Sequence, residues 1–285
     1  MLTVREYDDS ERFWREVAEP LNQPAVPNNV FVGVANRMRS ASSPDHLRFG
    51  VFDEGRLVLG ALHTPPFRLN LADSGSGESA TEALARHLAD RKVRLPGVVG
   101  HVRLAERFAD AWCEIAGQRR NEANVHGRRQ NLYQIERVTP PNGIAGRMRP
   151  AQAQERELLV RWEQGFAQDA GLGQNERDPA FVARVVDETL AQNGFALWEV
   201  EGAPVSTARL RRVASIGARI SGVYTPSALR GHSYASALTA ALSQKVLDEG
   251  LWCCLFADAA NPLTNRIYQS IGYVKLATFA DILFE

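Results

Sequence analysis

The spacing of apolar residues in the first half of the chain predicts alternating helices and strands. Helices are expected where apolar residues recur every three or four positions, over residues 8–19, 80–89 and 102–116. Strands are expected where short apolar runs lie between turn residues, over residues 47–52, 57–62, 67–71, 96–100 and 130–138. Because Asp53-Glu54-Gly55-Arg56 separates two of these strands, we expect a β-hairpin there.

The second half shows a similar order of helical and strand-like spacing. Its expected helices cover residues 151–166, 179–190, 235–246 and 262–271. Its expected strands cover residues 195–200, 205–213, 220–225, 251–257 and 278–284. The helix at 235–246 joins two strands, and a strand–helix–strand connection predicts a parallel pair. We therefore expect an α+β fold in two halves, each a mixed, mostly antiparallel sheet flanked by helices, and the repeated order indicates a structural duplication.

The two halves are expected to meet in a linker at residues 140–150. This stretch is rich in Pro and Gly and has no apolar periodicity. The predicted domains are therefore residues 1–139 and residues 151–285.

Composition narrows the class of protein. Among 285 residues, 33 basic and 33 acidic side chains cancel, so no excess of positive charge predicts binding to nucleic acid or to an anionic membrane. The first residues are charged, and no apolar run has the length of a membrane span. Cys113, Cys253 and Cys254 have neither a disulfide nor a metal-ligand spacing, and the adjacent pair is expected in a core strand. These features favour a cytoplasmic protein without a metal.

The junction between the strand at 220–225 and the next helix is the first candidate site. It contains Arg230, Gly231, His232, Ser233 and Tyr234. Small residues let backbone N–H groups approach a ligand closely, and the start of a helix carries partial positive charge. The junction therefore predicts an anion site at the carboxyl end of the sheet.

The last helix is the second candidate. Asn261 suits the N-cap, Pro262 suits the first helical position, and Gly272 suits the left-handed residue after the helix. Seven residues separate Asn261 from Tyr268, so their side chains share a face about 10 Å apart and are expected to line one groove.

Together these residues resemble the GNAT superfamily of N-acetyltransferases. The signature of that family is Arg or Gln, two residues, Gly, one residue, then Gly or Ala, and Arg230 to Ala235 match it except that Ser233 replaces the middle glycine. The pattern from Asn261 through Tyr268 to Ile271-Gly272-Tyr273 is similar to the family's last helix. The first half has no such signature, with Gly97, Gly100 and His101 near a later helix instead, and it resembles a degenerate acetyltransferase half without cofactor.

The resemblance implies that acetyl-CoA is a substrate of the second half. Backbone amides of Gly231 to Ala235 would hold its pyrophosphate, Arg230 would add charge near phosphate, and the strand end would offer backbone groups to the pantetheine arm. The implied acetyl-CoA-binding residues are Val223, Tyr224, Thr225, Arg230, Gly231, His232, Ser233, Tyr234, Ala235, Asn261 and Asn265.

The implied reaction is direct attack of an amine on the thioester, followed by protonation of the leaving thiolate. Tyr268 is the expected acid. Glu199, Glu201 and Asp258 lie near strand ends and are candidate bases, although carboxylates there are usually only solvated. The acceptor is a small-molecule or peptide amine, and members with two halves that act on amino sugars, thiols or peptide amines are all compatible with the sequence.

Other interpretations of the same residues stay open. Gly231 and Ser233 also fit a plain strand-to-helix turn, Asn261 fits a simple N-cap, and Tyr268 fits apolar packing. A protein that binds acyl-CoA without turnover, as a regulatory module, is the alternative from another functional class. The chain has neither of the glycine-rich motifs expected of dinucleotide and ATP folds.

Overall fold

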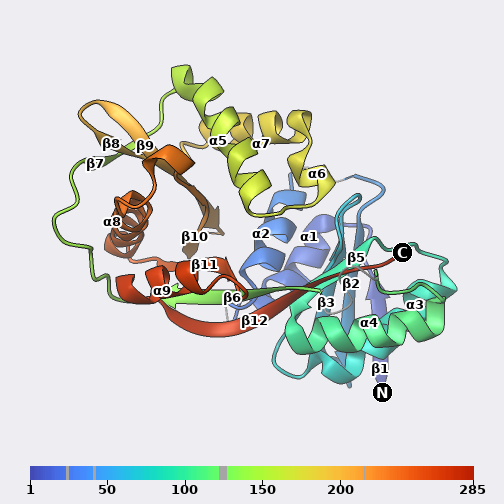
Figure 1. Cartoon of the computed structure of the whole chain (residues 1–285). Helices are drawn as coiled ribbons and strands as arrows, with labels where there is room; N and C mark the ends of the chain where they lie inside the picture. Colours follow the sequence, from blue (N-terminus) through green and yellow to red (C-terminus); the bar gives the residue numbers. More distant parts are fainter. Residues whose placement is uncertain (24–25, 41–42, 122–126, 215) are drawn as a thin grey trace. The chain divides into compact units, whose positions relative to one another are not determined.

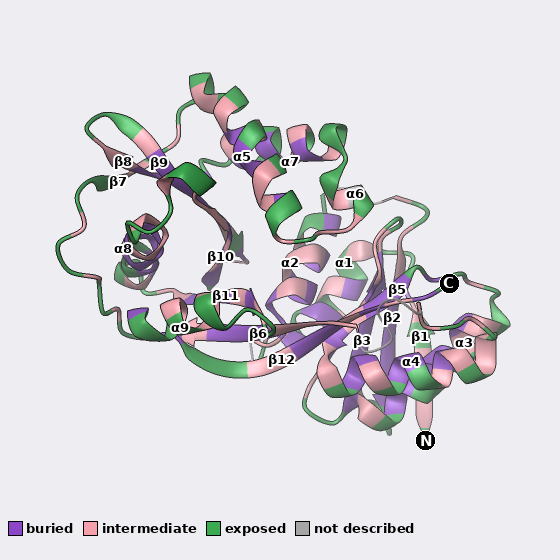
Figure 2. Ribbon diagram, in the orientation of Figure 1, coloured by how far each residue is buried: buried purple, intermediate pink, exposed green. Residues whose placement is uncertain are grey.

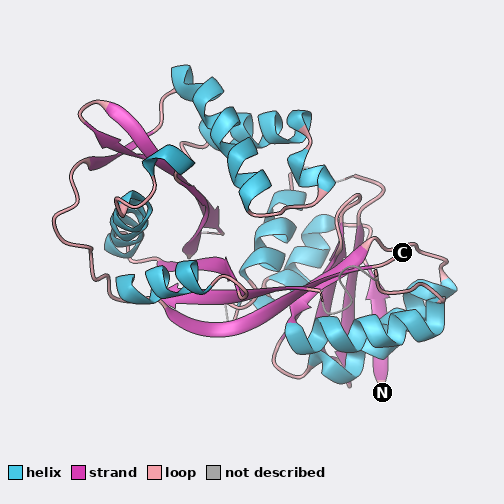
Figure 3. Cartoon of the chain, viewed as in Figure 1, coloured by secondary structure: helices cyan, strands magenta, loops and turns pink. Residues whose placement is uncertain are grey.

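The structure, a computed structural model of the whole chain, describes residues 1–23, 26–40, 43–121, 127–214 and 216–285 (Figure 1). The chain forms two compact units. Unit 1 comprises Met1–Leu132, Ala257–Pro262 and Lys275–Glu285, and unit 2 comprises Tyr133–Phe256 and Leu263–Val274. Each unit has a mixed, mostly antiparallel sheet flanked by helices, which confirms the predicted fold class (Figure 3).

In unit 1 the strands follow the order β1-β2-β3-β4-β5-β12. Neighbours are antiparallel except β4 and β5, which are parallel and joined through α3. The strands are β1 (Leu2–Glu6), β2 (Leu47–Asp53), β3 (Arg56–His63), β4 (Leu69–Asp73), β5 (Gly97–His101) and β12 (Val274–Leu283). The helices are α1 (Ser10–Phe13), α2 (Asn29–Met38), α3 (Ala80–Asp90) and α4 (Val102–Ala116).

The predicted hairpin between β2 and β3 is confirmed. Glu54 and Gly55 have φ angles of 48° and 84°, the two positive values that a tight hairpin turn requires. One core cluster joins this sheet to α3, α4 and β12, and it includes Phe49, Leu84 and Ile282. Figure 2 shows the buried residues following β2, β3 and β5.

In unit 2 the strands follow the order β11-β10-β9-β8-β7. The strands are β7 (Arg147–Pro150), β8 (Phe195–Val200), β9 (Ala203–Val213), β10 (Gly217–Tyr224) and β11 (Trp252–Asp258), and β6 (Arg128–Ile135) leads into the unit. The helices are α5 (Arg156–Asp169), α6 (Gln174–Arg177), α7 (Pro179–Ala191), α8 (Tyr234–Asp248) and α9 (Pro262–Ile271). β10 and β11 are parallel and joined through α8, as predicted.

The sheet of unit 2 has helices on both faces (Figure 1). On one face α5 and α7 pack against β8, with Leu159 and Val186 contacting the cluster of Phe195 and Leu197. α8 packs against β8, β9 and β10, and its buried residues include Leu242. Cys253 and Cys254 are buried in β11, which confirms their predicted place in a core strand.

The structure also differs from the sequence prediction in several places. β1 and α2 have no predicted counterpart, because β1 alternates with charged residues and the apolar run of α2 fits a strand as well as a helix. The compact units divide at Leu132 and Tyr133, with Lys275–Glu285 in unit 1. The domain boundary at residues 140–150 stays a prediction. Part of that predicted linker is β7, whose backbone pairs with β8.

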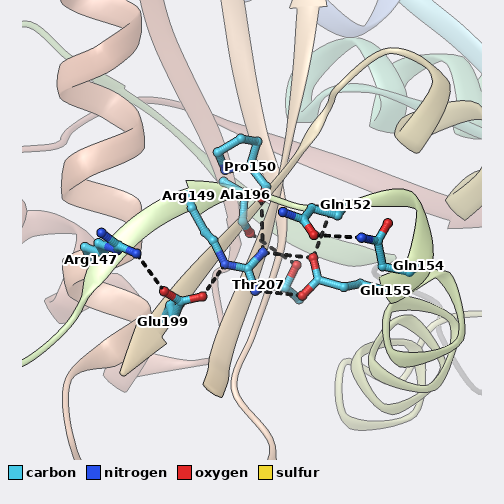
Figure 4. Close-up of polar contacts among 9 residues, drawn as sticks. All are labelled: Arg147, Arg149, Pro150, Gln152, Gln154, Glu155, Ala196, Glu199 and Thr207. Atoms are coloured by element: carbon cyan, nitrogen blue, oxygen red, sulfur yellow. Dashed lines mark hydrogen bonds and ion pairs between the residues drawn. The ribbon is translucent and has the colours of Figure 1, made fainter. Parts of the chain in front are cut away.

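An ion network fixes the start of unit 2 (Figure 4). Arg149 of β7 donates two hydrogen bonds to Glu155, at 2.8 and 2.7 Å, and a third to Glu199 of β8. Arg147 donates to the other oxygen of Glu199 at 3.3 Å. Hydrogen bonding to Arg149 is the main reason why the pKa values of Glu155 and Glu199 are lowered. The edge strand is thereby tied to its neighbour and to the turn before α5.

Replacing Arg149 with Met should lower the stability of the fold and make that stability less sensitive to acidic pH. In the wild type, the lowered carboxylate pKa values stabilise the fold above the ordinary value of 4.5, and this contribution disappears as the pH falls through the lowered values. In R149M the urea midpoint at pH 7 should be lower, and the further loss between about pH 7 and about pH 3 should be smaller.

The matched control is Arg156→Met, because Arg156 pairs with Asp187 in an exposed ion pair. R156M should stay close to the wild type at both pH values. Equal effects of R149M and R156M would contradict a special role for the network.

Candidate functional site

The chain between β10 and α8 turns through two left-handed residues. A short 3₁₀ turn at Ser227–Leu229 follows β10, and Gly231 and Ser233 then have φ angles of 87° and 59°. The first hydrogen bond of α8 runs from the N–H of Ala237 to the carbonyl of Ser233. Ser233 is therefore the N-cap, and its side chain makes no capping hydrogen bond.

The N–H groups from Gly231 to Ser236 make no hydrogen bond to any described residue. They include the unpaired donors of the first turn of α8, a helix that spans Tyr234–Asp248. Unpaired amides together with the positive end of a long helix favour an anion. The predicted anion site thus has the backbone arrangement that its chemistry requires.

Side chains around this loop are already engaged. Arg230 pairs with Asp169 and donates from Nε to the carbonyl of Thr225 at 2.9 Å. His232 stacks on Tyr234 with ring centroids 5.3 Å apart. The charge of Arg230 is therefore balanced by a carboxylate, and its hydrogen bond closes the turn after β10.

A β-bulge interrupts β10 just before the loop. Ser221 lies opposite Arg209 and Tyr224 lies opposite Thr207, so the strand holds one more residue here than its partner β9. Gly222 lies in this bulge with a φ angle of 58°. The described pairing with β11 runs from Gly217 to Ile220.

The predicted residues Val223, Tyr224 and Thr225 follow the bulge. Ser206 donates to the carbonyl of Tyr224 at 3.0 Å, and the Thr225 hydroxyl donates to Ser206 at 2.9 Å. These contacts hold the last residues of the strand after its register has shifted.

A buried ion pair lies against the bulge, and the sequence did not predict it. Glu163 of α5 is 3.2 Å from Nε of Arg209, and both side chains are largely buried. Burial raises the pKa of Glu163, and the charge of Arg209 partly opposes this shift. The position of Glu163 beside the apolar residues Leu159 and Trp162 of the same helix could have indicated a buried carboxylate from the sequence.

Tyr268 of α9 lies in a cluster of aromatic rings. Its ring centroid is 6.5 Å from that of Tyr133 and 6.0 Å from that of Tyr273. Burial raises the pKa of Tyr268 to about 12, and its hydroxyl makes no hydrogen bond to a described residue. The phenol is therefore a neutral donor at physiological pH.

Hydrogen bonds connect this cluster to α8 and β6. The Tyr133 hydroxyl lies 2.7 Å from Oδ1 of Asn265, and the Tyr273 hydroxyl lies 2.7 Å from Oγ of Ser243 in α8. Gly272 ends α9 with a φ angle of 113°, and the N–H of Tyr273 donates to the carbonyl of Tyr268. The predicted end of the last helix is confirmed. The side-chain oxygen of Asn265 accepts its hydrogen bond from Tyr133, which belongs to the protein itself.

Comparison with known proteins identifies this arrangement of elements. Residues 205–280 match the family described as FR47-like protein. A GNAT-family acetyltransferase from Colwellia psychrerythraea is 12% identical with a TM-score of 0.65, covering 99% of this chain and 100% of that chain. The chain has the GNAT fold.

Two further structures share this GNAT fold. A GCN5-related N-acetyltransferase from Sphaerobacter thermophilus is 15% identical with a TM-score of 0.59, covering 99% of this chain and 94% of that chain. A tandem GNAT protein from the clavulanic acid biosynthesis pathway is 13% identical with a TM-score of 0.58, covering 100% of this chain and 98% of that chain. No curated protein matches the sequence significantly.

The candidate bases named from the sequence lie in ion pairs or in a turn. Glu199 is held between two arginines, and its pKa is lowered. Asp258 lies 3.4 Å from Arg128 and accepts a hydrogen bond from the N–H of Ala260. Glu201 is an exposed turn residue with a φ angle of 50°. Carboxylates with these partners or positions stabilise turns and strand ends.

Two further features are absent from the described residues. Among the residues that the structure describes, no group of three His, Cys, Asp or Glu side chains is arranged to hold a metal ion. None of the helices in the described ranges combines the length and apolar character needed to cross a membrane.

Replacing Gly222 with Ala should destabilise unit 2. The left-handed conformation costs roughly 1–2 kcal/mol for a residue with a Cβ atom. The new Cβ would also lie 2.5 Å from Nε of Arg209 and 3.0 Å from Glu163, and such overpacking costs a further ~1–3 kcal/mol. Urea unfolding measures the sum.

Gly250→Ala is the matched control, because Gly250 has a φ angle of 72° but a methyl group there would meet no atom within 4 Å. G250A should show only the backbone cost. A loss in G222A no greater than in G250A would mean that the ion pair does not depend on the bare backbone at the bulge.

Proposed function

We propose that this chain transfers the acetyl group of acetyl-CoA to a primary amine of a small-molecule or peptide acceptor by direct attack. The observation that supports this most strongly is the row of unpaired N–H groups from Gly231 to Ser236, directly after a bulged strand in a GNAT fold. The unpaired N–H groups would bind the diphosphate of acetyl-CoA, and the bulged strand would contact the arm attached to it.

Backbone groups do most of the proposed binding. The amides of Gly231, His232, Ser233, Tyr234 and Ala235 hold the pyrophosphate. Arg230 holds the loop in place by its hydrogen bond to the carbonyl of Thr225 and its ion pair with Asp169. Val223, Tyr224 and Thr225 lie along the pantetheine arm, with Tyr224 and Thr225 fixed by Ser206.

In the proposed reaction the neutral amine attacks the thioester carbonyl and forms a tetrahedral oxyanion. Collapse of this intermediate breaks the carbon–sulfur bond and releases a thiolate. Tyr268 donates its phenolic proton to that sulfur, the acceptor nitrogen loses a proton to solvent, and the phenolate then takes a proton back from solvent. With its pKa raised to about 12, the phenol is protonated throughout the physiological range.

Asn265 and Asn261 have different proposed roles in and before α9. Asn265 orients α9, because its oxygen lies in hydrogen-bonding distance of the Tyr133 hydroxyl. Asn261 directly precedes the first turn of α9, and we assign it both the N-cap and a contact with the cofactor.

We also assign the transfer site to the second half of the chain alone, with residues 1–139 as a degenerate GNAT-like half, residues 140–150 as the linker and residues 151–285 as the transferase. In unit 1 the loop between β4 and α3 corresponds to the acetyl-CoA loop, since β4, α3 and β5 repeat the parallel strand–helix–strand order. There the carboxylate of Asp73 accepts a hydrogen bond from the N–H of Gly77 at 3.1 Å. A negative charge within the loop disfavours a diphosphate.

Replacing Ser233 with Asp should abolish tight binding of acetyl-CoA without harming the fold. Asp tolerates the left-handed conformation and is a good N-cap, so thermal stability should be retained or increased. Its charge would repel the diphosphate and compete for the same amides. Isothermal titration with acetyl-CoA should show a Kd increase of at least about tenfold, which corresponds to ~1.4 kcal/mol.

Ser233→Asn provides the neutral control of nearly the same shape. S233N should bind acetyl-CoA much better than S233D. If the wild type has no measurable affinity, or if both variants bind equally well, the loop does not hold the diphosphate.

Replacing Tyr268 with Phe should lower kcat by about 10²-fold, since a positioned proton donor contributes at least this much. The KM for acetyl-CoA should change little. In the wild type, no loss of activity from ionisation of this phenol is expected below about pH 11, because its pKa is raised to about 12. Thiol release from acetyl-CoA with a panel of amines measures these rates.

The control is Tyr273→Phe, whose lost hydroxyl contacts Ser243 and Cys253 in the core. Y273F should lose stability but keep most of its kcat. Binding of acetyl-CoA by the wild type without thiol release would instead identify a non-catalytic acyl-CoA-binding module.

A further inference from the structure

Arginine side chains gather on one face of the sheet in unit 2. Residues directly opposite each other in paired strands point to the same face, and Arg211 of β9 lies opposite Arg219 of β10. Arg209 is two residues from Arg211 and shares this face. The contact of Arg209 with Glu163 shows that the face is the one covered by α5.

The two arginines that β9 contributes to this face differ in their side-chain partners. Arg209 is neutralised by Glu163 at 3.2 Å. Arg211 is half-buried, and its side chain makes no ion pair or hydrogen bond to any residue that the structure describes. Burial and the neighbouring Arg209 lower its pKa, and exposed Glu188 of α7 opposes this without forming an ion pair. A partly desolvated guanidinium beside other arginines is costly unless an anion joins it.

The position of Arg211 along the sheet relates it to the bulge. Its strand partner Arg219 is three residues before Gly222, which is about 10 Å of extended chain. The amides of the loop lie beyond the other end of β10, after Tyr224. An acyl donor held at the loop and an acceptor held at the arginines would therefore approach the bulge from opposite directions along the strand.

We propose that Arg211 binds an anionic group of the acceptor, so that the preferred substrates are amines that also carry a carboxylate or a phosphate. This inference rests on the proposed acetyl transfer and names its substrate class. A guanidinium offers paired N–H donors that match either anion, and a fixed anchor would hold the amine near the thioester.

Paired acceptors that differ in the anion test the proposal. L-lysine is compared with cadaverine, and O-phosphoethanolamine with ethanolamine, using thiol release from acetyl-CoA to obtain kcat/KM. The wild type should prefer one anionic member over its partner by at least about tenfold, and the preferred pair tells carboxylate from phosphate. Arg211→Gln should remove the preference through KM for the acceptor, and Arg211→Lys should restore part of it.

The matched control is Arg212→Gln. Arg212 is the next residue of β9, is exposed on the opposite face and pairs with Glu249. R212Q should keep the preference, and the KM for acetyl-CoA should be the same in all these variants. Equal kcat/KM for both members of each pair in the wild type would overturn the proposal while leaving acetyl transfer intact.

A binding measurement keeps the two hypotheses separate. Thermal shift titrations with L-lysine and O-phosphoethanolamine should show saturable stabilisation of the wild type and of R212Q, but not of R211Q. This result would support the anion site even if no amine were acetylated, in which case only the transferase proposal would fail. If neither compound stabilised the wild type, the anion site would be refuted.

Discussion

Left-handed backbone at Gly222, Gly231 and Ser233 sets the course of the chain from β10 into α8. The first of these residues shifts the register of the strand, and the other two turn the chain so that α8 starts with unpaired amides. Bare backbone at the bulge also leaves room for the ion pair of Glu163 and Arg209. The loop proposed to bind an anion, the bulged strand and the buried ion pair therefore depend on a few residues with unusual φ angles.

Much of this fold follows from local sequence patterns. Apolar spacing located α4 and β8 with their observed bounds, and turn residues located the hairpin at Glu54 and Gly55. β1 was missed because its alternation is hidden by charged residues at an edge, where solvent accepts them. α2 was missed because its apolar run reads equally as a strand, and only tertiary burial of Phe31 and Met38 decides for a helix.

The candidate site was predictable where it consists of backbone. Glycine and small residues after a strand reveal exposed amides, and Gly272 reveals a helix end, because both depend on neighbours in the sequence. Side-chain partners were not predictable. Arg230 meets Asp169, and Glu163 meets Arg209, across elements that only folding brings together. The same limit concealed Arg211, since its lack of an ion pair among the described residues is defined by three-dimensional surroundings.

The return of the chain into unit 1 has a consequence for how the protein is made. β12 pairs with β5 over Phe279–Leu283, and Ala280, Ile282 and Phe284 complete the core of unit 1. During synthesis on the ribosome, the sheet of unit 1 can close only after Phe279–Leu283 have been made, because these residues pair with β5. Until then β5 lacks its partner on that side, and the two halves cannot be separated by a single cut without opening one of them.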